Sequence, residues 1–399
     1  MSAASSQPRP DHPPLLDAEA LARALAVRDL TDPARGPHAM QILLDRVRAA
    51  LAGRWGCAVR VHRAHPMVTV EDNYDRLRYP AGGAARDARY TRYVTPSTLL
   101  RTQTSAMIPP LLREIAAGIA AGSAAGGAGG PPPAGDLLLV CPGLVYRRDT
   151  IDRLHTGEPH QADLWRLTRG WHPGRRELLE MAEAAVGAAL PGAEWRAVPA
   201  DHPYTLGGLQ VDVRAGAEEW VEVGECGVAH PRVLAGAGLD PAEHGGLAMG
   251  LGLDRLLMLA KGVDDIRLLR SADPRVASQM LDLEPYRPVS TRPPVRRDLS
   301  LAVSAELTAE ELGDRVRSAL GDARAAQVEA IELLSETPGP ALPPAAAARL
   351  GLRPGQKNVL VRLTIRDLSR TLTQREANEL RDAVYAALHE GTVYVWAAR

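Results

Sequence analysis

Two arginines and several short acids occupy separate segments of this 399-residue chain, and their types suit phosphate chemistry. Arg147 and Asp149 lie two residues apart after an apolar run, so on a strand their side chains project from one face. Arg255 follows Asp254 at the end of the glycine-flanked segment 250–255. The planar guanidinium fork of arginine grips phosphate oxygens through two hydrogen bonds. These residues predict a site for a phosphorylated ligand.

A second pair supplies hydrogen-bond acceptors. Gln161 and Asp163 alternate along a predicted strand, so their side chains point to the same face. Such acceptors are what a substrate amino group needs. Taken alone, the arginine-rich segment 147–152 is typical of a solvated loop with surface ion pairs. Its occurrence together with the other two segments favours a single binding site.

Composition narrows the class of protein. The net charge is −1, so no global basic field attracts nucleic acid and any such contact must come from local patches. Cys57, Cys141 and Cys226 form no Cys-x-x-Cys pair, which predicts neither a zinc cage nor disulfides and fits a reducing cytoplasm. His155 and His160 have no third ligand at a familiar spacing, so we predict no metal site. No apolar run is long enough to span a membrane.

The chain divides into four predicted parts. Residues 1–14 form a disordered tail, and residues 15–283 form a first domain with a mobile loop at 116–135. A proline-punctuated linker over 284–294 leads to a second domain at 295–399. In the first domain, apolar periodicity predicts helices over 15–27, 37–51, 176–190 and 253–261 and strands over 59–62, 136–141, 209–213 and 220–223. Residues 98–112 form a further apolar segment, with Pro109 and Pro110 near a helix start or break.

The second domain has a different order of predicted elements. Strands and helices alternate as βαββαβ, which is the ferredoxin-like split motif. Thr308 with Glu311, and Thr373 with Glu376, form capping boxes at the two helix starts. The expected elements are strands over 297–303, 327–334, 359–365 and 393–396 and helices over 308–320 and 373–388.

Together these motifs resemble class II aminoacyl-tRNA synthetases, and specifically the catalytic module of phenylalanyl-tRNA synthetases. Residues 294–301 and 370–373 resemble the ferredoxin-fold anticodon-binding domain of the same enzymes. Carrying both in one chain is similar to the single-chain organellar form. The resemblance spans residues 60–399 and implies an α+β fold: a class II antiparallel sheet flanked by helices, plus a ferredoxin-like domain.

The resemblance implies particular roles at the phosphate end of the site. Arg147 matches the arginine on the α-phosphate of ATP, and Arg255 matches the one on the γ-phosphate. Asp149 matches the acid that contacts the adenine amino group, and His155 matches a histidine that helps to bind the nucleotide. Further nucleotide contacts are implied for Gly250, Gly252 and Asp254, the last of which stands where the family has glutamate.

At the amino-acid end, the resemblance includes a departure from the family pattern. Ser105, Gln161 and Asp163 match residues that read the substrate ammonium, and Ala248 matches a small residue that leaves room beyond the substrate ring. The family's Phe-Pro-Phe segment reads His202-Pro203-Tyr204 here, in a chain without any phenylalanine. Buried polar groups require partners, so either the substrate carries a polar substituent or the protein satisfies these groups.

The implied activity is ATP- and Mg²⁺-dependent activation of phenylalanine, or a close aromatic amino acid, and its transfer to tRNA. Two alternatives stay open: a paralogue that activates a noncanonical aromatic amino acid, and a tRNA-binding regulator without catalysis. A cytoplasmic location without membrane association, as a monomer or homodimer, is expected. Contacts with tRNA are implied for Arg296, Arg297 and Arg370.

Overall fold

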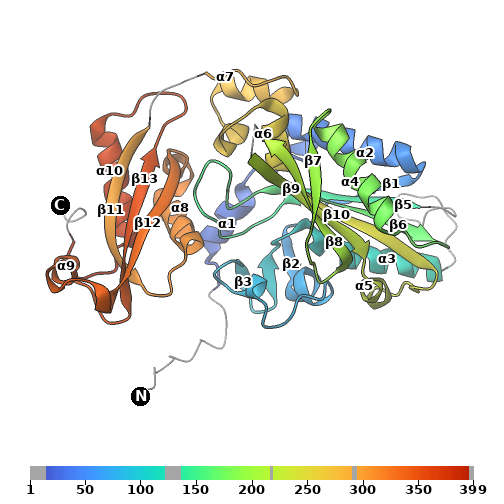
Figure 1. The fold of residues 1–399 in the computed structure, drawn as a ribbon, viewed down its shortest axis with the longest axis horizontal. Coiled ribbons are helices and arrows are strands. Elements are labelled where there is room, and N and C mark those ends of the chain that lie inside the picture. The colour runs from blue at the N-terminus through green and yellow to red at the C-terminus, as the bar shows by residue number, and fades with distance from the viewer. Residues whose placement is uncertain (1–14, 122–135, 216–218, 290–293, 395–399) are drawn as a thin grey trace, which may run out of the picture.

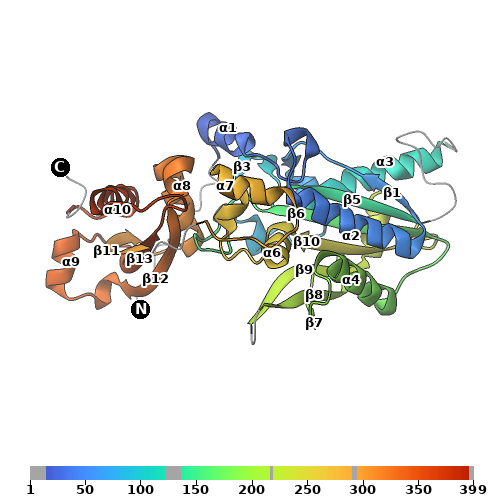
Figure 2. The same cartoon turned by 90° about the horizontal axis from the view of Figure 1, so that it is seen from above.

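The computed structural model contains two domains side by side along the long axis of the molecule (Figures 1 and 2). The expected tail over 1–14, most of the expected loop over 116–135 and part of the expected linker lie outside the described residues. The structure describes residues 15–121, 136–215, 219–289 and 294–394.

A seven-stranded sheet in the order β1-β5-β6-β10-β9-β8-β7 forms the centre of the first domain. The predicted antiparallel sheet flanked by helices is confirmed, and only the pair β1 and β5 at its edge runs parallel. The long connection between β1 and β5, which includes a helix, returns the chain to the same end and permits parallel pairing. The strands are β1 (Ala58–Val61), β5 (Leu137–Leu144), β6 (His160–Arg169), β7 (Trp195–Pro199), β8 (Thr205–Ala215), β9 (Glu219–Ala229) and β10 (His244–Gly252).

Helices cover both faces of this sheet, and alternate strand residues feed two cores. Leu138 and Val140 of β5 pack with one group of helices, whereas Leu137 and Leu139 pack with the other. None of the helices among the described residues is long and apolar enough to cross a bilayer. One group comprises α2 (Ala39–Trp55), α4 (Arg175–Ala189) and α6 (Leu253–Lys261), and the other comprises α3 (Ile108–Ala120) and α5 (Pro231–Gly236).

A small three-stranded sheet, β2-β4-β3, lies next to the main sheet. The apolar segment predicted over 98–112 begins as strand β4, continues as a 3-10 helix over Thr104–Met107 and becomes an α-helix at Ile108. Pro109 and Pro110 lie in the first turn, where proline's missing N–H costs nothing. The remaining elements here are α1 (Ala18–Ala26), β2 (Met67–Thr69), β3 (Tyr93–Thr95), β4 (Thr98–Leu100) and α7 (Pro274–Ala277).

The C-terminal domain packs two long helices on a three-stranded sheet, β11-β13-β12, around a separate hydrophobic core. Both predicted capping boxes are present. The expected last strand lies partly outside the described residues, and its described part, Val393 and Tyr394, is not in a strand. The elements are β11 (Val295–Ser304), α8 (Ala309–Ala325), β12 (Val328–Pro338), the unpredicted α9 (Pro344–Leu350), β13 (Gln356–Ile365) and α10 (Gln374–Leu388).

Candidate active site

One cavity of about 470 Å³ brings together the three motif segments. It lies over β6, β9 and β10, whose register places Gln161 opposite Gly252 and Asp163 opposite Gly250. Every residue predicted to bind the nucleotide or the amino acid lines it, except Ala248. The predicted residues in its lining are Ser105, Arg147, Asp149, His155, Gln161, Asp163, His202, Tyr204, Gly250, Gly252, Asp254 and Arg255.

The two predicted phosphate-binding arginines line the cavity together with the acid Glu222. Arg255 Nη1 donates to the Glu222 carbonyl oxygen at 3.1 Å. Burial and the charge of Glu225 raise the pKa of the Glu222 carboxyl, and the positive charges of Arg255 and Arg147 oppose that rise. The buried Arg147 Nε makes no hydrogen bond with the described residues. Two cations therefore converge on one cavity, and Arg147 still has a donor available.

His155 connects the arginine loop to Arg255. Its Nδ1 lies 2.7 Å from Asp152 Oδ2, and Arg255 Nη2 donates to its Nε2 at 3.0 Å. Accepting from Arg255 requires a neutral ring with its proton on Nδ1. The hydrogen bond to Asp152 raises the pKa of His155. His155 therefore fixes the direction of the Arg255 guanidinium.

We expect the substitution His155→Ala to raise the KM for ATP by about tenfold, because Arg255 loses the contact that orients it. The KM for the amino acid stays close to that of the parent protein, since His155 makes no contact at that end. Steady-state pyrophosphate exchange with each substrate varied in turn measures both constants. An equal rise in both would show that the cavity has collapsed, contradicting this role.

Asp254 fixes the backbone and the ring of His160 at the start of β6. Its carboxylate accepts from the His160 backbone N–H at 2.5 Å, and the His160 ring Nδ1 lies 3.0 Å away. His160 Nε2 accepts from the Leu30 backbone N–H at 3.0 Å, which places the ring proton on Nδ1. Burial raises the pKa of Asp254, but the hydrogen bonds from His160 and the charge of Arg270 lower it overall. Asp254 thus anchors the start of β6 beside the nucleotide motif.

The amino-acid end contains residues that the motifs did not reveal. Glu225 of β9 pairs with Gly250, which pairs on its other side with Asp163. Tyr79 donates to Gln103 Oε1 at 2.8 Å and also lines the cavity. The strand predicted over 220–223 stops short of Glu225, so only its extension to Ala229 could have placed this acid.

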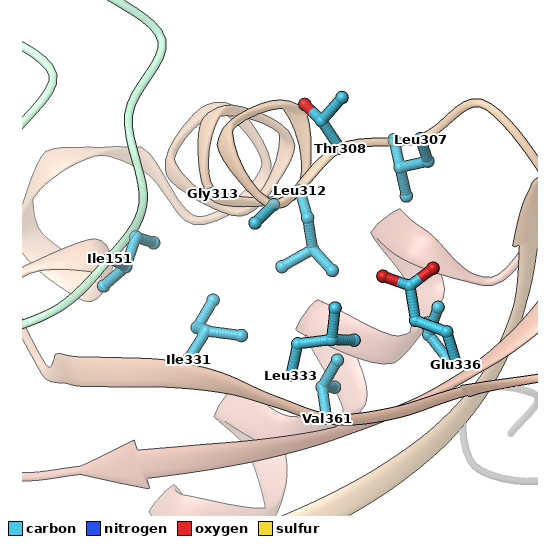
Figure 3. Close-up of a pocket in the computed structure, with 11 residues that line it drawn as sticks. Ile151, Leu307, Thr308, Leu312, Gly313, Ile331, Leu333, Glu336 and Val361 are labelled. Atoms are coloured by element: carbon cyan, nitrogen blue, oxygen red, sulfur yellow. The ribbon is translucent and has the colours of Figure 1, made fainter.

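The C-terminal domain holds the segment that follows Arg147. Arg317 of α8 donates to the carbonyl oxygens of Asp149 at 2.8 Å and Thr150 at 2.6 Å. Gly313 permits this approach, because a Cβ there would lie 2.6 Å from the Asp149 carbonyl oxygen. Ile151 points into an apolar cleft beside Leu312 and Ile331 (Figure 3). The backbone that carries Asp149 is therefore fixed from the second domain.

The predicted tRNA-binding arginines lie on two faces of the C-terminal sheet. Arg297 donates to Asn378 Oδ1 at 3.0 Å, and Arg370 pairs with Glu376 at 2.8 Å, both beside the start of α10. Arg296 alternates with Arg297 along β11, is exposed, and its side chain makes no hydrogen bond or ion pair with the described residues. Of these three arginines, Arg296 therefore has the guanidinium that is most accessible to a phosphate in the described structure.

The cavity combines two arginines with the buried acid Asp163 and the half-buried acid Glu225, charges that suit an anionic ligand and an ammonium-bearing one. Residues 34–280 match the family model described as tRNA synthetases class II core domain (F), and residues 290–393 match the ferredoxin-fold anticodon binding domain. The chain therefore belongs to the class II aminoacyl-tRNA synthetases, with an anticodon-binding domain of the ferredoxin fold.

Similar proteins include both multi-subunit and single-chain relatives. The phenylalanine–tRNA ligase alpha subunit of Limosilactobacillus reuteri (strain DSM 20016) is 34% identical over 61% of this chain and 68% of its own length. That of Rhodopseudomonas palustris (strain BisB5) is 31% identical over 65% and 73%. The chloroplastic/mitochondrial phenylalanine–tRNA ligase of Arabidopsis thaliana is 28% identical over 80% and 68%.

Proposed function

We propose that this protein activates phenylalanine, or a close aromatic amino acid, with ATP and transfers it to tRNA in the cytoplasm. The observation that carries this proposal is that Arg147 and Arg255 line the same cavity as the buried acid Asp163. The names of the relatives support the amino-acid class. The three free cysteines support a reducing compartment.

In the proposed first step, the amino-acid carboxylate attacks the α-phosphorus of ATP, and the bond to the leaving pyrophosphate breaks. Both reactants are anionic, so the cavity must neutralise charge while holding them in line. Arg147 would grip the α-phosphate and Arg255 the γ-phosphate. Gln161, Ser105 and Asp163 would accept from the substrate ammonium. In the second step, a hydroxyl of the terminal adenosine of tRNA, the 2′ hydroxyl if the family pattern holds, attacks the acyl carbon and AMP leaves.

Glu222 is the residue that fits a Mg²⁺ ion bound to the nucleotide. It lines the cavity, the charges of Arg255 and Arg147 both act on its carboxyl, and Mg²⁺ is usually held by one or two carboxylates together with substrate phosphates. The ion, when bound, would neutralise phosphate charge. No group of three or more candidate metal ligands occurs among the described residues.

Two assays on the full chain test the proposal. Amino-acid-dependent exchange of labelled pyrophosphate into ATP reports activation, and acylation of tRNA reports transfer. We expect both with an aromatic amino acid. Binding of tRNA without exchange for any amino acid would support a regulator without catalysis and overturn the proposal.

We expect the substitution Arg296→Ala to weaken tRNA binding and to reduce the salt-dependence slope by about one, as for loss of one phosphate contact. Arg362→Ala is the matched control, because Arg362 already pairs with Asp298 at 2.8 and 2.9 Å. Affinities measured between about 50 and 200 mM salt give both slopes. Identical slopes for the Arg296 variant and the parent protein would exclude Arg296 as a phosphate contact.

A further inference from the structure

The amino-acid end of the cavity contains two acids separated by a glycine. Asp163 of β6, Gly250 of β10 and Glu225 of β9 lie directly opposite one another across three strands, so both carboxylates rise from the same face. Two strand spacings separate their backbones by about 10 Å. A Cβ at Gly250 would meet only Asp163 Oδ1, at 3.9 Å. The glycine therefore leaves open space between the two acids.

Asp163 is an acceptor that the described residues satisfy poorly. Its side chain is buried, and neither carboxylate oxygen makes a hydrogen bond of normal geometry with the described residues. Burial raises its pKa to about 7, although Ser105 and Trp165 lie close enough to lower it somewhat. An ionised buried carboxylate without a partner is costly, so this position is suited to a ligand that supplies donors.

Glu225, in contrast, is partly neutralised by the protein. His202 Nε2 lies 2.6 Å from Glu225 Oε2, an ion-pair contact whose geometry falls short of a hydrogen bond. The neighbouring carboxylate raises the pKa of His202. The two polar replacements in the family's Phe-Pro-Phe segment thus differ: His202 faces an acid, whereas Tyr204 packs against aromatic rings.

The far end of the cavity is closed by aromatic packing. Trp165 lies directly opposite Ala248, and neither residue lines the cavity. Tyr204 packs against Trp165 and Tyr79, with ring centroids 6.3 Å apart in each case. A substrate ring entering here meets the Tyr204 phenol, the His202 imidazole and the Asp163 carboxylate. It does not reach the small residue that the family pattern places beyond the ring.

The substrate ammonium does not account for all of these acceptors. An ammonium group has three donors, and Ser105 and Gln161 also line the cavity where the resemblance places it. Gln161 lies on the same face of β6 as Asp163, two residues nearer the arginine loop. With Gln161, Ser105 and one Asp163 oxygen serving the ammonium, the second Asp163 oxygen, near the Trp165 N–H, and the Tyr204 hydroxyl, near Ser105, face a substrate side chain.

We infer that this cavity selects an aromatic amino acid whose ring carries a hydrogen-bond donor, a hydroxyl or an amino group, over unsubstituted phenylalanine. This inference rests on the proposed function and specifies its substrate. A site built to hydrogen-bond a substrate group discriminates strongly against the analogue that lacks it, because its buried polar groups are then left unpaired.

The test compares kcat/KM in pyrophosphate exchange for phenylalanine, tyrosine, meta-tyrosine and 4-aminophenylalanine. 4-Methylphenylalanine is the control for size, since it fills similar volume without a donor. We expect at least one donor-bearing substrate to exceed both phenylalanine and 4-methylphenylalanine by about tenfold or more. If either donor-free compound equals the best donor-bearing one, the inference fails while the proposed function stands. Absence of exchange with every compound would overturn the proposed function itself and this inference with it.

A variant shows whether the named residues set the preference. The double substitution His202→Phe with Tyr204→Phe removes the two polar tips and restores two apolar rings. We expect its preference to shift toward phenylalanine by about tenfold. His172→Phe, an exposed histidine outside the cavity lining, is the matched control and keeps the parent preference. A folded double variant with an unchanged preference would exclude these side chains as selectors, and thermal melting checks the fold.

Discussion

Replacing Arg147 with glutamine lowers pyrophosphate exchange by about 1000-fold, because the α-phosphate loses the cation that neutralises it as the carboxylate attacks. Arg147 lines the cavity and has a buried Nε without a hydrogen bond to the described residues. The guanidinium is therefore placed for a ligand rather than for the protein. Exchange assays on the purified variant at saturating ATP and amino acid measure the loss in kcat.

Arg153→Gln is the matched control for this prediction. Arg153 belongs to the same loop, but its side chain is exposed and its Nη1 makes only a long ion-pair contact, 4.0 Å from Asp264 Oδ2. An exposed ion pair of this kind contributes little, so we expect exchange within about twofold of the parent value. Equal losses in the two variants would mean that the loop as a whole, rather than the Arg147 guanidinium, is required.

The substitution Asp163→Asn has two opposite effects. Binding of the amino acid weakens, and we expect its KM to rise by about 100-fold because a charged acceptor for the ammonium is lost. The ligand-free protein becomes more stable, because the substitution removes a buried carboxylate that makes no hydrogen bond with the described residues. Exchange kinetics and urea unfolding of the same preparation measure both effects.

The stabilisation depends on pH in a defined direction. The folded-state pKa of Asp163 is about 7, above its usual 3.8, so the folded protein favours the protonated carboxyl. Its contribution to stability is fully present below about pH 4 and is lost as the pH rises to about 7. The advantage of Asp163→Asn therefore grows over this window, by up to roughly 4 kcal/mol.

Asp254→Asn is the control, for which we expect the opposite change in stability. Asp254 is equally buried but accepts hydrogen bonds from His160, and its pKa is lowered. Its replacement should destabilise the protein at neutral pH, where the ionised carboxylate is used. If Asp163→Asn were destabilising as well, or if its effect were the same at about pH 4 and pH 8, Asp163 would not be an unpartnered acid.

The sequence allowed much of the nucleotide end to be predicted, because its residues are specified by local spacing. Arg147 and Asp149 lie just beyond β5, and Arg255 follows the turn that opens α6. Helix α6 occupies the predicted range of 253–261, since apolar periodicity and the preceding glycine mark its limits. The capping boxes of α8 and α10 were equally local signals.

The amino-acid end depended on strand register, which no local pattern reveals. Trp165 faces Ala248 only because β6 and β10 pair as they do, and that pairing takes Ala248 out of the cavity lining. Glu225 joins the site through its pairing with Gly250. The hydrogen bond from Arg317 to the Asp149 carbonyl oxygen joins two residues that lie 168 positions apart and in different domains. Such contacts follow from tertiary packing rather than from periodicity.

The most direct test of the account is a crystal structure of the protein with Mg²⁺ and a non-hydrolysable ATP analogue. We predict one triphosphate in the cavity over β6, β9 and β10, with the α-phosphate hydrogen-bonded to Arg147 and the γ-phosphate to Arg255. A nucleotide bound elsewhere, or bound here with either arginine turned away from its phosphates, would contradict it.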